Sequence, residues 1–188
     1  MKEFLPQNGG YRKLRVYKLT EIIYDLTVVF VRRFVPSSSR TVDQMVQAAR
    51  SGKQNIAEGS MASVTSSETE IKLTNVAKAS LEELLLDYED YLRQNCLQKW
   101  VGSNERLCKL RLYLKSDAFM LNPLGLTERY SGEEYCNLCI TLINQATYML
   151  RRLLIYQQDK FVKEGGIKEK MYKARVEYRD VRQGKKSL

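Results

Sequence analysis

The densest group of side chains capable of acid–base or metal chemistry is a run of carboxylates. It comprises Glu82, Glu83, Asp87, Glu89 and Asp90. Helical bundles that hold two metal ions combine such acids with histidines, in Glu-x-x-His pairs that face inward. This chain contains no histidine, and leucines occupy much of the core side of the same helical segment. We therefore interpret the acids as a solvated helix face and predict no bound metal and no other cofactor.

The composition also argues against enzymatic activity in general. Without histidine, the chain lacks the commonest general base and every Ser-His or Cys-His nucleophile pair. It contains neither a Walker A motif nor a GxGxxG motif. We predict a protein that is not an enzyme. The alternative is carboxylate-only catalysis, which requires a pocket that holds two facing acids.

The four cysteines do not have the spacing of a zinc site. Cys136 and Cys139 lie three residues apart in a helical pattern, whereas Cys96 and Cys108 have no close partner. A zinc ribbon needs two close pairs. We expect free, partly buried thiols.

Two features of the apolar residues indicate where in the cell we expect the protein. Residues 1–10 lack the apolar run of a signal peptide. The longest uncharged stretch, residues 135–150, is too short and too polar to span a bilayer. We expect a cytoplasmic protein that does not enter a membrane.

Positive charge is concentrated at the two ends of the chain, whose net charge is +9. Residues 1–53 carry ten Lys/Arg against four Asp/Glu, residues 159–188 carry ten against five, and residues 54–158 carry eleven against thirteen. Basic clusters with interleaved aromatics bind phosphates without reading sequence, and their binding weakens steeply with salt. The predicted nucleic-acid-binding residues are Arg12, Lys13, Arg15, Lys18, Arg32, Arg33, Arg40, Arg50 and Lys53. The alternative is a set of solvated helix faces that bind no ligand.

Apolar residues recur at three- and four-residue spacing in four long segments, which predicts four helices. These cover residues 11–34, 41–59, 66–98 and 132–162, and residues 104–118 add a short helix. Only 3 Pro and 10 Gly interrupt the chain. The prediction is an all-α, antiparallel up-down four-helix bundle over residues 1–163. Residues 164–188 follow as a C-terminal basic segment, either a short helix or a tail.

Local signals set the expected helix ends. Thr65 with Glu68, and Ser131 with Glu134, match capping boxes. Gly59 reads as a C-terminal stop. Small residues in the second helix predict a close approach of a neighbouring helix. The apolar stripe of residues 132–162 is wider than a surface helix needs, which indicates a central helix or a face buried against another subunit.

The predicted second helix ends in a five-residue motif that consists of Asn55, Ile56, Ala57, Glu58 and Gly59. Asn55 and Glu58 are three residues apart and share a helix face. One interpretation is that they hydrogen-bond a neighbouring chain and fix its packing. The other is a cap-and-stop signal with satisfied polar side chains.

The stretch from Ala48 to Gly59 resembles the signature of the bacterial four-helix bundle family. That family includes proteins encoded in intervening sequences of large-subunit ribosomal RNA genes and the accessory variability determinant of diversity-generating retroelements. Residues 14–17 and 80–84 are similar to the family too, and residues 165–172 resemble a suffix segment of one branch. The resemblance covers residues 11–98 and resumes over 133–156.

The resemblance implies an up-down bundle that assembles as a ring, commonly a pentamer, without enzymatic activity. The retroelement member is similar in being basic and in partnering a reverse transcriptase and nucleic acid. We therefore expect a homo-oligomeric adaptor that binds RNA, DNA or a reverse-transcriptase-like partner. The alternative is a protein–protein scaffold that binds no nucleic acid.

Overall fold

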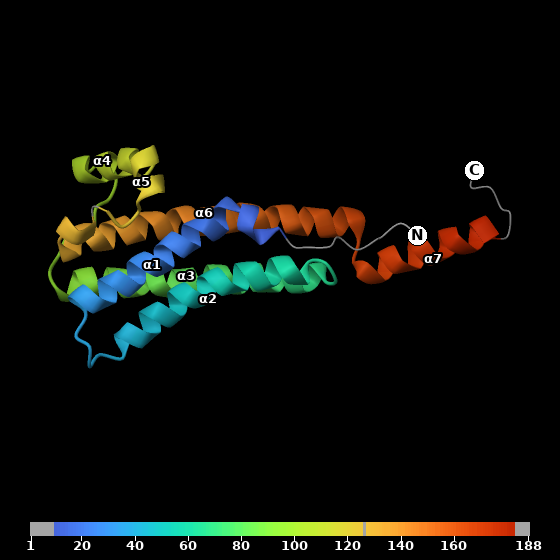
Figure 1. The fold of residues 1–188 in the computed structure, drawn as a ribbon, viewed down its shortest axis with the longest axis horizontal. Helices are drawn as coiled ribbons and strands as arrows, with labels where there is room; N and C mark the ends of the chain where they lie inside the picture. Colours follow the sequence, from blue (N-terminus) through green and yellow to red (C-terminus); the bar gives the residue numbers. More distant parts are fainter. Residues whose placement is uncertain (1–9, 126, 183–188) are drawn as a thin grey trace.

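The computed structural model describes residues 10–125 and 127–182, and this part of the chain is helical with no strand (Figure 1). The α-helices are α1 (Arg15–Phe34), α2 (Thr41–Ala62), α3 (Ser67–Gln94), α4 (Glu105–Tyr113), α5 (Asp117–Leu121), α6 (Gly132–Glu164) and α7 (Ile167–Arg182). Two 3-10 turns, η1 (Tyr11–Lys13) and η2 (Thr127–Arg129), precede α1 and α6. No helix among the described residues combines the length and apolarity needed to cross a bilayer.

The prediction of an all-α bundle is confirmed, because α1, α2, α3 and α6 pack antiparallel along one axis (Figure 1). Their apolar stripes meet in one core, in which Ile23, Leu81 and Ile143 are fully buried. Burial of such a side chain contributes about 1.5–3 kcal/mol. α6 lies centrally enough to bury Tyr135 through Ile140 almost without interruption, as its wide stripe predicts.

An aromatic cluster fills the end of the core near the α1–α2 connection. The Phe30 ring centroid lies 4.9 Å from that of Tyr88 and 5.6 Å from that of Tyr135. Both tyrosine hydroxyls are satisfied: Tyr88 donates to Oγ1 of Thr27 at 3.0 Å, and Tyr135 donates to the carbonyl of Leu26 at 3.0 Å. The cluster therefore buries large rings without leaving a polar atom unpaired.

Small residues bring α2 and α3 into close contact, as predicted, but Gly59 does not stop α2. The helix continues to Ala62, and Gly59 is buried against α3. A Cβ atom on Gly59 would lie 3.2 Å from Cβ of Leu73, and one on Gly52 would lie 2.7 Å from Cδ2 of Leu81. Both glycines are thus packing positions, and the stop interpretation was wrong because a glycine can serve close approach as well as termination.

The start of α3 is one residue later than its predicted capping box. Ser66, and not Thr65, is the N-cap, and its Oγ accepts from the amide of Thr69 at 3.1 Å. The box predicted at α6 is confirmed, with Ser131 and Glu134 bonded reciprocally. Serine is the better N-cap of the two, but the glutamate three residues after Thr65 favours Thr65 in the sequence pattern.

α3 ends at Gln94, four residues before the predicted end. Cys96 has a φ of 55°, and the amide of Leu97 donates to the carbonyl of Leu92 at 2.8 Å. This is the Schellman arrangement that ends many helices, usually with glycine at the left-handed position. Because cysteine occupies that position here, the sequence carries no termination signal.

The connection between α3 and α6 folds onto the outer side of α6. The helix predicted over residues 104–118 is two helices, because Ser116 caps a new start and its Oγ accepts from the amide of Phe119. The turn at residues 122–125 closes through the amide of Gly125 and the carbonyl of Asn122 at 3.2 Å. At the other end of the bundle, α7 forms a helix that buries none of its residues (Figure 1).

Candidate nucleic-acid interface

Four predicted cations form a row at the start of α1. Arg12 and Lys13 lie in η1, Arg15 and Lys18 lie in the first turn of α1, and all four are exposed. We call these residues the N-terminal basic row. Bonds from the amide of Lys13 to the carbonyl of Gly10 and from Leu14 to Tyr11 hold the 3-10 turn that presents them.

The N-terminal basic row is placed unfavourably for stability. Helix starts carry a partial positive charge, so cations there repel the helix dipole. The first turn of α1 contains no acidic residue to offset this. No charged group of the row forms an ion pair within the part of the chain that the structure describes. The row is therefore free to meet an external anion.

The other predicted cations of α1 lie at its opposite end. Arg32 is 17 residues from Arg15, or roughly 25 Å along the helix. The helical period puts Glu21 and Asp25 on the same side between them, and both acids are exposed. The basic residues of α1 are thus two separate groups and not one continuous stripe.

Arg33 serves an internal role. Its guanidinium donates to the carbonyls of Thr127, Glu128 and Tyr130, the last two at 3.1 and 3.2 Å. It also lies 4.7 Å from the ring centroid of Phe34. Arg33 therefore ties the end of α1 to η2, and much of its donor capacity is committed within the chain.

The α2 cations are spread along that helix. Arg40 occupies the N-cap position and Arg50 is exposed in mid-helix. Nζ of Lys53 lies 4.5 Å from the ring centroid of Tyr24, a cation–π contact between α2 and α1. Arg50 is thus the freer of the two mid-helix cations.

The Asn55–Gly59 motif is used largely inside the chain. Nδ2 of Asn55 donates to the carbonyl and to Oγ of Ser51, at 2.9 and 3.1 Å. Oγ of Ser51 in turn lies 2.9 Å from Oγ of Ser80 on α3. Ile56, Ala57 and Gly59 are buried, whereas Glu58 is exposed. The motif organises the α2–α3 contact.

The tertiary structure assembles a further basic surface that the sequence did not indicate. A groove of about 480 Å³ between α4 and α6 is lined on one side by Lys99, Arg111 and Lys115 and on the other by Asn144 and Tyr148. We call it the α4–α6 groove. No acidic side chain lines it. Tyr148 is exposed, so the groove combines cations with an accessible aromatic ring.

Two of the groove cations are free of internal ion pairs. Within residues 10–125 and 127–182, neither Arg111 nor Lys115 forms a salt bridge, whereas Nζ of Lys99 lies 2.6 Å from Oε1 of Glu89. The four-residue spacing of Arg111 and Lys115 could have indicated this basic surface from the sequence. The net charge of residues 54–158 hides it, because that segment has more acids than cations.

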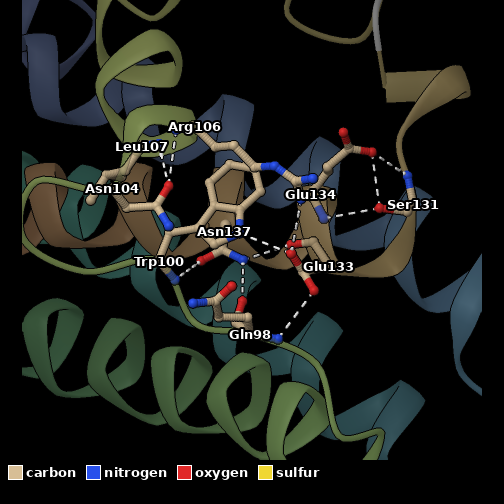
Figure 2. A network of polar contacts seen from close by, with 9 residues as sticks. All are labelled: Gln98, Trp100, Asn104, Arg106, Leu107, Ser131, Glu133, Glu134 and Asn137. Carbon is tan, nitrogen blue, oxygen red and sulfur yellow. Dashed lines mark hydrogen bonds and ion pairs between the residues drawn. The ribbon is translucent and has the colours of Figure 1, made fainter.

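Trp100 anchors the connection that carries the groove cations (Figure 2). Its backbone amide donates to Oδ1 of Asn137 at 2.7 Å and its indole Nε1 donates to Oε1 of Glu133 at 2.9 Å. Gln98 adds two bonds: its amide donates to Oε2 of Glu133 at 3.1 Å, and its carbonyl accepts from Asn137. Trp100 itself is only 8% exposed.

The same bonds set the charge state of Glu133. Hydrogen bonds from Trp100 and from the amide of Gln98 lower the pKa of Glu133, and Arg106 adds to this effect. Donors that bond a carboxylate favour its ionised form. The anchor is therefore a charged acceptor, and charge-assisted hydrogen bonds are the stronger kind.

The carboxylates of α3 do not form a pair of facing acids. Asp87 and Asp90 line a cleft of about 450 Å³ with Phe34, Met45 and Tyr91. They are neighbours on one helix, and Asp90 is paired with Arg93 at 2.9 Å. Within the described residues, no three Cys, Asp or Glu side chains are grouped so as to hold a metal ion.

The cysteines divide by burial. Cys136 and Cys139 lie in the core, where burial raises the pKa of both thiols, that of Cys139 to about 12. Such thiols are protonated and inert at neutral pH. Cys96 and Cys108 are exposed.

No protein-family model matches the chain, and neither a curated protein nor a solved structure is detectably similar to it. The resemblance to the bacterial four-helix bundle family therefore stays a prediction from residues 48–59 and the segments around them.

Proposed function

We propose that the protein is a non-enzymatic, homo-oligomeric adaptor that binds nucleic acid, or a nucleic-acid-processing partner such as a reverse transcriptase, through its basic helix faces. The main support is the N-terminal basic row. Its four exposed cations are held by a helix start that their charge destabilises, and no acid in the first turn offsets them. A phosphate backbone supplies the missing negative charge.

The α4–α6 groove supports the same function with different chemistry. Arg111 and Lys115 offer charge for phosphates, and the exposed ring of Tyr148 offers a stacking surface. Proteins that bind unpaired strands combine these two elements, and each stacked base contributes about 1–3 kcal/mol. The groove therefore favours a single-stranded segment over a regular duplex.

The proposed homo-oligomer is supported by apolar surface on the C-terminal half of α6. Ile155, Tyr156 and Val162 are more than half exposed, and Val162 reaches 82%. Large apolar patches on a surface mark interaction sites. A ring would also multiply the basic row, so that weak individual sites act together.

One observation favours the alternative of a protein–protein scaffold without nucleic acid. α7 has an apolar side, yet none of its residues is buried. A helix of this kind is suited to a protein partner. Under this alternative the basic residues act only in solubility and partner choice.

The deciding experiment measures binding of the purified chain to single- and double-stranded oligonucleotides over a salt series, with its mass determined in the same buffers. If the basic row makes four phosphate contacts, the slope of log K against log salt for a duplex is about −3.6 for each engaged chain. Micromolar or tighter binding by an oligomer supports the proposal. Absence of binding at low salt rejects direct binding of nucleic acid and leaves a protein partner or the scaffold.

A further inference from the structure

α7 carries an apolar stripe with the spacing of a coiled-coil helix. The stripe consists of Ile167, Met171, Ala174, Tyr178 and Val181, separated by alternating steps of four and three residues. This is the a/d pattern of a helix that pairs lengthwise with another helix. Tyr178 is 61% and Val181 80% exposed, so the stripe faces water in the isolated chain.

α7 also has little packing against the rest of the described chain. It has 16 residues and projects beyond the end of the bundle (Figure 1). This length is only slightly more than the about 12–15 residues below which even alanine-rich isolated helices are marginal in water, and most helices in proteins depend on packing of their apolar face. The stripe of α7 therefore points to a helix or a groove that covers it in the assembled protein.

The charges beside the stripe restrict what can cover it. α7 carries six Lys/Arg and three Asp/Glu. In the heptad defined by this stripe, with Met171 and Tyr178 at a positions, the e positions that flank the contact are occupied by Lys168, Arg175 and Arg182. Two antiparallel copies of α7 would place these cations against one another, which destabilises pairing. The covering surface must instead be acidic.

The chain contains one such surface on α3. Residues 79–92 hold five acids and no Lys or Arg. In their midst Leu86 is 62% exposed, with Glu82 and Glu83 on the preceding turn. Asp90 and Glu89 are engaged with Arg93 and Lys99, but Glu82 and Glu83 have no ion-pair partner among the described residues. This face thus offers an apolar contact with unneutralised acids beside it.

The dimensions of the two surfaces match. The α7 stripe from residue 167 to 181 and the α3 segment from residue 79 to 92 are each roughly 20 Å long. Within one chain they lie apart, because the C-terminal half of α3 is at the α4 end of the bundle and α7 leaves the opposite end (Figure 1). The match is therefore available to a second copy of the chain.

We propose that α7 of one protomer docks lengthwise on the C-terminal half of α3 of a second copy, with its stripe against Leu86 and its arginines against Glu82 and Glu83. Each copy both donates an α7 and receives one, so the contact is head-to-tail and closes as a ring or extends as a filament. This inference rests on the homo-oligomeric part of the proposed function and is independent of nucleic-acid binding.

The test is a charge swap read by sedimentation velocity over a range of concentrations. The α7 variant is Arg175→Glu with Arg182→Glu, and the α3 variant is Glu82→Lys with Glu83→Lys. Each variant alone brings like charges together at the contact, and we expect its dissociation constant to rise at least tenfold. A chain that carries all four changes should restore assembly, since every α7 then meets an α3 of opposite charge whatever the number of subunits.

The matched control is Lys173→Glu with Arg179→Glu, which changes the charge of α7 equally but at the c and b positions of the heptad, which do not flank the contact. It should assemble like the unmodified chain, and circular dichroism verifies that all variants stay helical. The proposal is overturned if the unmodified chain is a monomer at all concentrations, if the control loses assembly as the α7 variant does, or if the chain with all four changes fails to assemble. Assembly without any nucleic-acid binding would leave this contact intact and reject only direct binding of nucleic acid.

Discussion

The indole Nε1 of Trp100 lies 2.9 Å from Oε1 of Glu133, and this bond fastens the long α3–α6 connection to the first turn of α6. Because Trp100 begins the segment that carries Arg111 and Lys115, its anchoring also sets where the groove cations lie. A partly buried contact thereby links the packing of an irregular segment to the charge of a surface.

Replacement of Glu133 by Ala should loosen the indole of Trp100, whose backbone stays bonded to Asn137. The change removes the acceptor for the indole and for the amide of Gln98, and bonds to a charged group contribute about 1.5–3 kcal/mol each. Trp100 is the only tryptophan, so its emission should shift to the red and become easier to quench. Glu133→Gln, which retains an acceptor, should show a smaller shift. Emission unchanged in Glu133→Ala would contradict the anchor role.

Replacement of Asp87 by Asn should stabilise the bundle near neutral pH. Burial raises the pKa of Asp87 from 3.8 to about 6, with Glu83 and Asp90 adding to it, and its Oδ2 has no hydrogen-bond partner among the described residues. A raised pKa means that the folded state disfavours the ionised carboxylate. The free energy of unfolding therefore falls as the pH rises from 4 to 6 and Asp87 ionises. Because the side chain is half-buried and partly screened by solvent, we expect a discounted gain of about 1 kcal/mol.

The pH profile distinguishes this effect from a general one. Urea unfolding of Asp87→Asn and the unmodified chain should differ at pH 7 and converge below about pH 4, where both side chains are neutral. A constant difference across this range would reject the electrostatic cause.

Replacement of Gly52 by Ala should destabilise the protein, although alanine is normally the better helix former by about 1 kcal/mol. The new Cβ would lie 2.7 Å from Cδ2 of Leu81, which is fully buried and has little room to move. Overpacking of this kind costs about 1–3 kcal/mol, so after the gain in helix propensity the net loss in chemical denaturation is up to about 2 kcal/mol. Gln47→Ala, at an exposed position of α2, should change the free energy of unfolding by less than about 0.5 kcal/mol. A stabilised Gly52→Ala would show that α2 and α3 are not in close contact here.

Charge reversal in the N-terminal basic row should abolish most polyanion binding. The variant is Arg12→Glu, Arg15→Glu and Lys18→Glu, all at exposed positions. Loss of three phosphate contacts should lower affinity at least tenfold and reduce the salt slope by about 3 for a duplex. Helicity should be retained, because acids at a helix start favour the helix dipole.

Its control reverses the same number of exposed cations elsewhere: Lys72→Glu, Lys109→Glu and Arg129→Glu. An equal loss of affinity in both variants would mean that net charge, and not the row, governs binding. Unchanged affinity in the first variant would exclude the row as an interface.

Much of the architecture follows from local information. The three- and four-residue apolar period predicts α1, α2, α3 and α6, because each helix must bury one side and a stripe of that period is continuous only on a helix. The Ser131–Glu134 capping box locates the start of α6 because both of its bonds form between residues three apart. The exposure of the N-terminal basic row likewise follows from its charge, since unpaired lysine and arginine are almost never buried.

Other features depend on contacts between distant segments. Whether Gly59 ends α2 or packs against α3 depends on where Leu73 lies, and no property of residues 55–62 contains that information. Cys96 takes a left-handed conformation that its residue type does not predict, because bonds around it and the docking of Trp100 favour it. The sequence does not distinguish Arg33 from a solvated surface cation. Only the fold brings the carbonyls of Thr127, Glu128 and Tyr130 to its guanidinium.

The sequence by itself determined the helical period, the number of long helices and the charge of each segment, because these are properties of neighbouring residues. Only the tertiary structure decided which cations stand free, which are engaged internally, and which gather from residues 99–115 into one groove beside Asn144 and Tyr148. The physical reason is that electrostatic and packing energies depend on distances in space, and the chain brings residues dozens of positions apart to within a few ångströms of one another.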